Sequence, residues 1–364
     1  MPRVVISGYY GFHNSGDEAI LHAMLQALRE AVPGLEAVVL SKDPGHTSRE
    51  FGVRSVLRDK PLKVLKALRE CDLLISGGGG LLQDVTGPKS IIYYLGIVAM
   101  ARLLGKPVFF YAQGIGPVSG AMGRFLVRLV ANRVDVITVR DTDSKDELVA
   151  IGVTRPRIHV TADPVLGLDP SLFDRKKGRD ILSSLGIEEG PLAGISVRPW
   201  KGLDGFKKAV AKAADDLVAQ GWQALLVPMH FPGDVEACRE VAALMAGRVH
   251  VLDGSLGYRD LLAVTANLDL AIGMRLHFLI FSAIFGVPIF GIPYDPKVNC
   301  FLQSLGLSPG LDAEGLEYDQ LASGIKDLLR EREKISGGLK ERVSLLRREA
   351  LRNASLVAEL FQKI

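Results

Sequence analysis

The chain has 364 residues, which is too long for one domain and too short for three, since domains run about 100 to 200 residues each. Hydrophobic residues make up 48% and charged residues 23%, as in folded globular proteins, so the composition excludes a disordered, collagen-like or coiled-coil chain. The 44 basic and 41 acidic residues give a net charge of +3, which is too balanced for a general binder of nucleic acid or other polyanions.

Short β-branched runs alternate with amphipathic stretches along the whole chain, the pattern of parallel sheets with crossover helices. In the first half we predict strands at 4–7, 37–40, 73–76, 108–111 and 136–139, and helices at 17–31, 62–70, 90–104, 123–132 and 143–151. In the second half we predict strands at 194–197, 224–228, 249–252, 270–273 and 288–291, and helices at 206–219, 234–246, 258–267 and 276–285. The sequence therefore predicts an α/β fold of two Rossmann-like domains facing across a cleft.

The predicted organisation has four parts: an N-terminal domain at 1–168, a linker rich in Pro, Asp and charge at 169–190, a C-terminal domain at 191–335 and a helix at 336–364. The stretch 326–352 has nine basic and five acidic residues, a charge of +4 that leaves −1 for the rest of the chain. Apolar residues of the last helix recur mostly at intervals of three and four, so we expect its apolar face to pack on the body of the protein. The alternative is contact with an anionic membrane surface.

Cysteine usage and the N-terminus both indicate a cytoplasmic protein. If the basic C-terminal helix contacts a membrane, the protein would lie peripherally at the inner face of that membrane. Cys71, Cys238 and Cys300 are odd in number, far apart and without the spacing of a zinc or redox site. The N-terminus enters a predicted strand at once and has no signal-peptide pattern. The apolar stretch 278–294 is broken by glycine and proline and falls short of the ~20 residues that span a membrane.

Parallel α/β sheets bind ligands at the carboxyl ends of their strands, so the loops that follow the predicted strands are candidate sites. The first loop contains Tyr10, Asn14 and Ser15, which we take as candidates to bind substrate. Asn14 or Ser15 can cap the following helix, and two acidic residues in its first turn favour a sugar over a tightly bound phosphate. The loop is neither a GxGxxG fingerprint nor a Walker loop, which excludes nicotinamide dehydrogenases and P-loop ATPases.

Four successive glycines follow the third predicted strand, and Gly78, Gly79 and Gln83 of this segment are further candidates to bind substrate. Successive glycines can bring several backbone amides to one oxygen-rich group, and the alternative is a tight turn between strand and helix. Arg140 ends another strand. It either pairs with Asp141 or Asp143 or points into the cleft, and the sequence leaves both open.

The C-terminal half brings cations and imidazoles to strand ends. Arg275 and His277 follow one strand, Lys297 follows the next, and Arg198 and His230 end two others. Arginine matches carboxylate and phosphate groups, and histidine titrates near neutral pH, so this set suits a small polyanion with a proton to be moved. The histidines and carboxylates lack metal-ligand spacings, and we expect no metal.

These motifs resemble the polysaccharide pyruvyltransferase family, most closely its CsaB-type branch from the cell-wall pathway of S-layer-bearing bacteria. The resemblance spans nearly the whole chain in order, through residues 8–12, 14, 16–21, 76–79, 81–84, 112–117, 139–141, 162–164, 274–277 and 294–298. It implies a GT-B-like fold, phosphoenolpyruvate as donor and no cofactor. It also implies an undecaprenyl-diphosphate-linked saccharide as acceptor, whose N-acetylmannosamine receives a 4,6-linked pyruvate ketal for a secondary cell-wall polymer that anchors the S-layer.

The resemblance further implies roles for single residues. The family's catalytic histidine falls on His277, its neighbouring cations on Arg275 and Lys297, and its N-domain arginine on Arg140. In this hypothesis His277 is the general acid or relays a proton, Arg275 and Lys297 neutralise the leaving phosphate, and Arg198 or Arg140 orients a carboxylate. Two alternatives stay open: a nucleotide-sugar glycosyltransferase of similar architecture, and a non-catalytic binder of cell-wall saccharide or lipid.

Overall fold

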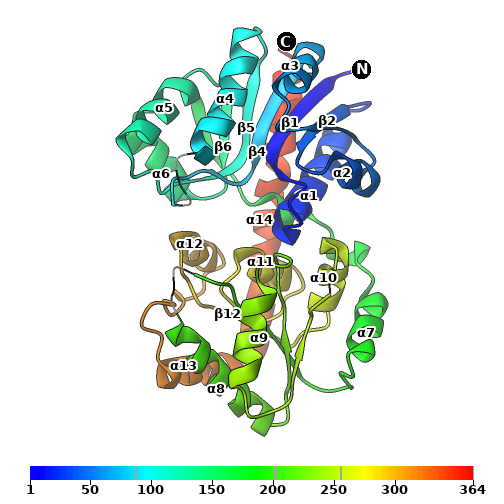
Figure 1. The fold of residues 1–364 in the computed structure, drawn as a ribbon, viewed down its shortest axis with the longest axis vertical. Helices are drawn as coiled ribbons and strands as arrows, with labels where there is room; N and C mark the ends of the chain where they lie inside the picture. Colours follow the sequence, from blue (N-terminus) through cyan, green and yellow to red (C-terminus); the bar gives the residue numbers. More distant parts are fainter. Residues whose placement is uncertain (86, 88, 201, 203, 255, 364) are drawn as a thin grey trace. The chain divides into compact units, whose positions relative to one another are not determined.

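The computed structural model describes residues 1–85, 87, 89–200, 202, 204–254 and 256–363. Two compact units make up the chain, one of Met1–Leu168 with Leu346–Ile364 and one of Asp169–Leu345 (Figure 1). The chain therefore passes from one unit to the other twice, after Leu168 and inside its last helix. Ile364, at the end of the predicted tail helix, lies outside the described residues.

The first unit contains one parallel sheet. Its strands are β1 (Arg3–Tyr10), β2 (Glu36–Ser41), β3 (Arg54–Leu57), β4 (Leu73–Leu82), β5 (Val108–Ile115), β6 (Val136–Val139) and β7 (Arg157–Val160). They lie in the order β3-β2-β1-β4-β5-β6-β7, and every neighbouring pair is parallel. Because the strand order reverses between β1 and β4, the loops after these strands open at the position where such sheets bind ligands.

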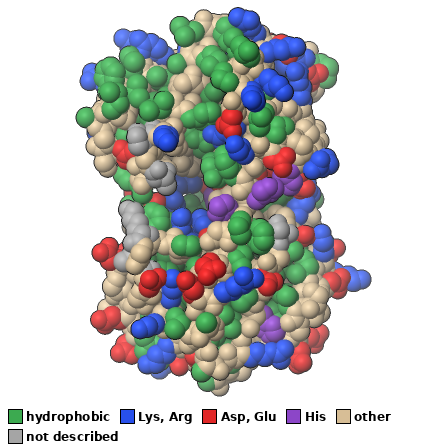
Figure 2. All heavy atoms as spheres, viewed as in Figure 1, with side chains coloured by type: hydrophobic (Ala, Val, Ile, Leu, Met, Phe, Trp, Pro, Cys, Tyr) green, Lys and Arg blue, Asp and Glu red, His purple; other side chains and the backbone are tan. Residues whose placement is uncertain are grey.

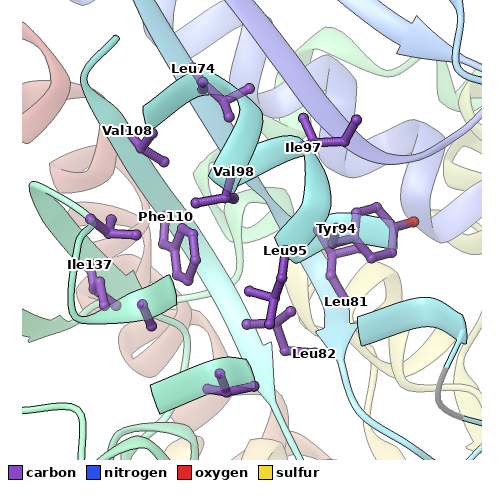
Figure 3. Close-up of a cluster of buried hydrophobic side chains, with 14 of the residues drawn as sticks. Leu74, Leu81, Leu82, Tyr94, Leu95, Ile97, Val98, Val108, Phe110 and Ile137 are labelled. Atoms are coloured by element: carbon purple, nitrogen blue, oxygen red, sulfur yellow. The ribbon is translucent and has the colours of Figure 1, made fainter. Parts of the chain in front are cut away.

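In the described part of this unit, the α-helices between these strands are α1 (Ser15–Ala31), α2 (Pro44–Phe51), α3 (Pro61–Glu70), α4 (Lys89–Leu103), α5 (Ala121–Ala131) and α6 (Thr142–Ile151). A short 3-10 helix, η1 (Pro164–Gly167), follows β7. Buried side chains of α3 to α6 form one hydrophobic cluster with the sheet. Figure 3 shows Tyr94, Leu95 and Val98 of α4 in this cluster, with Phe110 of β5.

The second unit contains a smaller parallel sheet. Its strands are β8 (Leu192–Ser196), β9 (Gln223–Leu226), β10 (Val249–Val251), β11 (Leu270–Gly273) and β12 (Ile289–Gly291), in the order β10-β9-β8-β11-β12. Its helices are η2 (Pro170–Leu172), α7 (Arg175–Ser184), α8 (Gly205–Ala219), α9 (Val235–Leu244), α10 (Tyr258–Thr265), α11 (Leu276–Ile284), α12 (Pro296–Ser304) and α13 (Tyr318–Arg330). The predicted alternation of strands and helices is thus present in both units.

The stretch 169–190, which we predicted as a linker, contains η2 and α7 and belongs to the second unit. Two of its three aspartates have capping roles, since Asp169 accepts from an amide at the start of η2 and Asp174 from amides at the start of α7. Helix α7 packs on α10, where Lys177 pairs with Asp260. Caps and loops use the same residue types, which is why composition indicated a linker here.

The last helix, α14 (Arg332–Phe361), is long, and the two units divide it between Leu345 and Leu346 rather than at 336. Its apolar face is buried: Leu339, Val343, Ala350, Val357 and Leu360 are each at most 9% exposed. The expectation that this face packs on the body is confirmed. Among the described residues, no helix is both long enough and apolar enough to span a membrane.

The sequence patterns missed the two edge strands of the larger sheet. β3 and β7 are four residues long, begin with Arg54 and Arg157, and are mostly half-exposed. An edge strand carries charge and needs no continuous apolar run, so it lacks the signal of the central strands. Helices α2, α12 and α13 were also not predicted. β4 is longer than predicted and continues through the four glycines.

Candidate active site

Three cationic side chains of the second unit, Arg198, Lys297 and Arg275, act electrostatically on Tyr294, which follows β12. Arg198 Nη1 donates a hydrogen bond to the Tyr294 hydroxyl at 3.0 Å. The Arg198 guanidinium carbon lies 4.8 Å from the centre of the Tyr294 ring and 5.0 Å from that of Trp200. Lys297 Nζ lies 5.4 Å from the Tyr294 ring centre. Two of the predicted cations of this unit, Arg198 and Lys297, therefore lie close to the same tyrosine.

The pKa of the Tyr294 phenol lies below its ordinary value. Burial by itself would raise this pKa, but the positive charges of Lys297, Arg198 and Arg275, with the hydrogen bond from Arg198, outweigh burial. A phenol with a lowered pKa gives up its proton more readily than an ordinary tyrosine does. Tyr294 falls within the motif at 294–298, but the sequence pattern indicated no role for it. A signal existed, because a tyrosine directly after a strand shares the edge of the sheet with the cations.

Arg275 is held by a buried aspartate. It is the N-cap residue of α11, and its Nε donates to Asp234 Oδ2 at 2.8 Å while its Nη2 pairs with Asp234 Oδ1. The same Asp234 Oδ2 accepts from the backbone amides of Met229 at 3.2 Å and His230 at 3.0 Å. Asp234 is 0% exposed. It therefore fixes the guanidinium and the loop after β9 together, a role that sequence analysis missed.

The predicted residues of the second unit lie at the carboxyl ends of four neighbouring strands, in the sheet order β9-β8-β11-β12. His230 follows β9, Arg198 follows β8, Arg275 and His277 follow β11, and Lys297 follows β12. His277 is half-buried in the first turn of α11. Lys297 Nζ also lies 3.0 Å from Asp295 Oδ2, so part of its charge is compensated.

Tyr10 is buried, which counts against the prediction that it binds substrate. Its side chain is 0% exposed, and its hydroxyl donates to the Gly77 carbonyl oxygen at 2.6 Å. This bond ties β1 to β4 inside the first unit. Asn14 caps α1, because its side-chain oxygen accepts from the amides of Gly16 at 3.1 Å and Asp17 at 3.4 Å, while Ser15 is buried. The predicted cap is confirmed for Asn14.

Packing accounts for Gly78 and Gly79 of the glycine run. Gly78 and Gly79 are buried and have left-handed backbones, with φ of 73° and 85°. A Cβ atom on Gly78 would overlap Ile20 Cγ2 of α1, and one on Gly79 would lie 2.9 Å from Asp17 Oδ1. These contacts show why two glycines are needed where β4 meets α1, and they count against the predicted substrate contacts. Gln83 is half-buried just after β4.

Arg140, whose orientation the sequence left open, is ion-paired. Its Nε lies 3.4 Å from Asp141 Oδ2 and its Nη1 lies 3.4 Å from Asp163 Oδ2, and the side chain is 7% exposed. It lies against Gly114, where a Cβ atom would come within 2.6 Å of Arg140 Nη2. Two carboxylates compensate its charge, which makes it a poorer anion-binding group than Arg198, whose contacts are with the rings of Trp200 and Tyr294.

Glu18 is a buried carboxylate that sequence analysis did not single out. It is 5% exposed, and its Oε1 accepts from the Gly11 amide at 2.9 Å. Burial raises the pKa of Glu18 to about 7, against the opposing effect of that hydrogen bond. The loop after β1 is therefore held by a group that titrates near neutral pH. In the part of the chain that the structure describes, no three His, Cys, Asp or Glu side chains are arranged to hold a metal ion.

The chain is similar in sequence to known proteins. Residues 14–296 match the family described as Polysaccharide pyruvyl transferase. The Amylovoran biosynthesis protein AmsJ of Erwinia amylovora is 24% identical over 256 residues, which cover 66% of this chain and 61% of that protein. The chain thus spans about three fifths of the length of that curated relative.

Solved structures share the fold. HepE of Anabaena, in complex with UDP-glucose, has a TM-score of 0.70 at 15% identity, with both chains fully covered. The S. aureus MnaA–UDP structure has a TM-score of 0.66 at 14% identity and covers 94% of this chain and 91% of its own. At these identities the likeness concerns the fold alone. It confirms the predicted GT-B-like class of paired Rossmann-like domains, and the cleft between them stays a prediction.

Proposed function

Because the chain belongs to the polysaccharide pyruvyl transferase family, we propose that it moves the enolpyruvyl group of phosphoenolpyruvate onto a saccharide and leaves a pyruvate ketal there. The observation that carries the proposal is the group of Arg198, Arg275 and Lys297 around Tyr294 at one edge of the second sheet. Phosphoenolpyruvate has a phosphate and a carboxylate on one small carbon skeleton. Guanidinium groups match both, so three cations suit this donor.

The chemistry requires two proton transfers at the donor. Protonation turns the methylene of phosphoenolpyruvate into a methyl group and makes the neighbouring carbon electrophilic. One acceptor hydroxyl bonds to that carbon, the bond from the carbon to the phosphate oxygen breaks, and a second hydroxyl closes the ketal. Of the two hydroxyl protons, one balances the proton taken up by the methyl group and the other leaves with phosphate.

The residues of the second unit supply the groups for these steps. In our proposal His277 is the general acid and base, and Arg275 and Lys297 neutralise the phosphate as it leaves. Arg198 orients the donor carboxylate, and the Tyr294 phenol is the second group that exchanges a proton. Asp234 holds Arg275 in place and touches no reacting atom. No step in this scheme requires a metal or cofactor.

The proposed acceptor is N-acetylmannosamine in a lipid-linked cell-wall saccharide, with the ketal on its 4- and 6-hydroxyls. The motif resemblance to the CsaB-type branch supports this acceptor and, with it, a role in the secondary cell-wall polymer that anchors an S-layer. The loop after β1 and Gln83 are the proposed acceptor contacts. A lipid-linked acceptor made in the cytoplasm places the reaction at the inner face of the membrane.

One incubation tests the proposal. Pure protein is mixed with phosphoenolpyruvate and a soluble lipid-disaccharide analogue that contains N-acetylmannosamine, and mass spectrometry follows the acceptor while a phosphate assay follows the donor. The expected product is the acceptor plus a pyruvate ketal, with one phosphate released per ketal. An analogue without the 6-hydroxyl cannot form the ketal. Transfer of sugar from a labelled sugar nucleotide would instead favour a glycosyltransferase, and saccharide binding without phosphate release would favour a non-catalytic binder.

His277→Gln tests the proton transfer. The variant keeps the size and hydrogen-bonding capacity of the side chain but has no titratable nitrogen, so we expect turnover to fall by roughly 100-fold or more. Turnover at the wild-type rate would remove the acid and base role of His277.

A further inference from the structure

Helix α4 has an apolar outer face as well as an apolar inner one. Its inner side chains pack in the core cluster shown in Figure 3. On the outside Ile92 is 54% exposed, Leu103 is 89% exposed, and Gly96 is exposed between them. A helix that is apolar all round is normally covered on both sides. The outer face of α4 is therefore an exposed apolar surface, which is unfavourable in water.

The neighbouring helix α5 continues this surface. Met122, Phe125 and Leu129 recur at intervals of three and four, so they share one face of α5, and they are 66%, 59% and 41% exposed. The two helices are packed together, since a Cβ atom on Gly123 would lie 3.2 Å from Ile91 Cδ1 of α4. Figure 2 shows hydrophobic side chains gathered over α5 at the upper left, with basic side chains beside them. We call Ile92, Leu103, Met122, Phe125 and Leu129 the α4–α5 surface.

The charges that α5 and its C-terminal end carry are all positive. The segment 121–133 contains Arg124, Arg128 and Arg133 and no acidic residue. Arg124 pairs with Glu147 at 3.2 Å. Arg128 and Arg133 are exposed, and among the described residues neither forms an ion pair with a carboxylate. Exposed Arg155 lies next to this end of α5, because its backbone amide donates to Asn132 at 3.0 Å.

We propose that the α4–α5 surface binds an anionic lipid bilayer. Exposed Phe, Leu and Met side chains on one helix face, flanked by arginines, are what an interfacial helix buries at the boundary between headgroups and acyl chains. A second copy of the chain fits this surface less well. A symmetric dimer through this face would bring exposed Arg128 and Arg133 of both copies close to each other, and like charges repel.

The C-terminal helix is the less suitable membrane surface, although it is basic. Most of its apolar side chains, among them Leu339 and Val357, are buried in the protein and are not available to enter a bilayer, whereas Leu345 is 40% exposed. On the α4–α5 surface, by contrast, the apolar side chains and the neighbouring Arg128 and Arg133 are all exposed. The inference does not depend on the proposed function, although a bilayer surface is where a lipid-linked acceptor would be met.

Vesicle co-sedimentation tests the inference directly. Full-length protein is mixed with vesicles of phosphatidylcholine and phosphatidylglycerol, or of phosphatidylcholine alone, at low and high salt. We expect binding to the anionic vesicles, and a loss of about tenfold or more in apparent affinity for Phe125→Ser/Leu129→Ser. Arg128→Gln/Arg133→Gln should lower affinity by roughly tenfold at low salt and weaken the salt dependence.

Matched controls separate this surface from others. Leu172→Ser/Leu244→Ser removes leucines that are 64% and 47% exposed in the second unit, and Arg342→Gln/Arg348→Gln removes exposed charges of α14. Both should bind vesicles like the wild type. Each variant should also keep the wild-type rate on soluble substrates, so that failure of the enzymatic proposal and failure of this one are distinguishable. The inference would be overturned if the wild-type protein did not bind anionic vesicles. It would also be overturned if light scattering showed a dimer of the wild type that Phe125→Ser/Leu129→Ser converts to a monomer.

Discussion

The carboxylate of Asp234 holds the guanidinium of Arg275 from a fully buried position, 41 residues away in sequence. It also accepts from the amides of Met229 and His230, so one side chain ties the loop after β9 to the start of α11. A buried pair of this kind is costly to break, because the remaining charge stays out of water.

Replacing Asp234 should damage both stability and donor binding. For Asp234→Ala we expect a loss of about 3 kcal/mol in the free energy of unfolding, since Arg275 and two amides lose their acceptor. Asp234→Asn should keep part of the stability and raise the KM for phosphoenolpyruvate more than it lowers kcat, because it releases Arg275 without removing a reacting group. Urea denaturation and steady-state kinetics measure the two effects. Unchanged stability in Asp234→Ala would contradict the role assigned to the pair.

Tyr294→Phe should keep the ring that packs on Trp200 and lose the hydroxyl. We expect kcat to fall by roughly 100-fold, with a change in the pH dependence of kcat, because a proton-exchanging group is gone. Phenolate absorbance gives a readout without activity: one tyrosine of the wild type should titrate below the usual range and be absent in Tyr294→Phe. Tyr318→Phe is the control, since the hydrogen bond to Asp216 raises the pKa of that tyrosine. An identical titration curve in Tyr294→Phe would refute the assignment.

Glu18 should make the first unit less stable as pH rises. Its pKa is about 7 when folded, above the value of about 4.5 when unfolded, so the folded state binds the extra proton between these values. Stability is therefore greatest below about pH 4.5 with respect to this group and declines until about pH 7. Glu18→Gln should remove roughly 2 kcal/mol of this decline between about pH 5 and about pH 8, measured by urea denaturation. Glu314→Gln, at an exposed position of the second unit, should follow the wild-type curve.

Gly78→Ala tests whether the glycine run serves packing. The new methyl group meets Ile20 on a left-handed backbone, so we expect a loss of about 3 kcal/mol in the free energy of unfolding. Gly80→Ala is the matched control two residues on. Its nearest neighbour would be the Gly114 carbonyl oxygen at 4.0 Å, and it should change stability little. Equal effects of the two substitutions on thermal unfolding would argue against packing as the reason for Gly78.

The edge of the second sheet was predictable because of how parallel sheets are built. Residues directly after strands meet at one edge whatever the strand order, so Arg198, Arg275, His277 and Lys297 could be grouped from sequence. The strand order itself, and the pairing of Asp234 with Arg275 across that edge, depend on contacts between distant segments. Local patterns carry no information on such contacts.

By itself, then, the sequence determined the alternation of strands and helices, a helix cap at Asn14 or Ser15, and the cations at the strand ends of the second unit. Each of these follows from local periodicity or from position after a strand. Only the tertiary structure decided that Tyr10 and the glycines serve packing, that Arg140 is paired with Asp163, and that Tyr294 lies among three cations. The tertiary structure also decided which apolar helix face stays exposed. Burial, pKa and charge compensation are set by neighbours in space, and those neighbours come from strands and helices that are far apart in the chain.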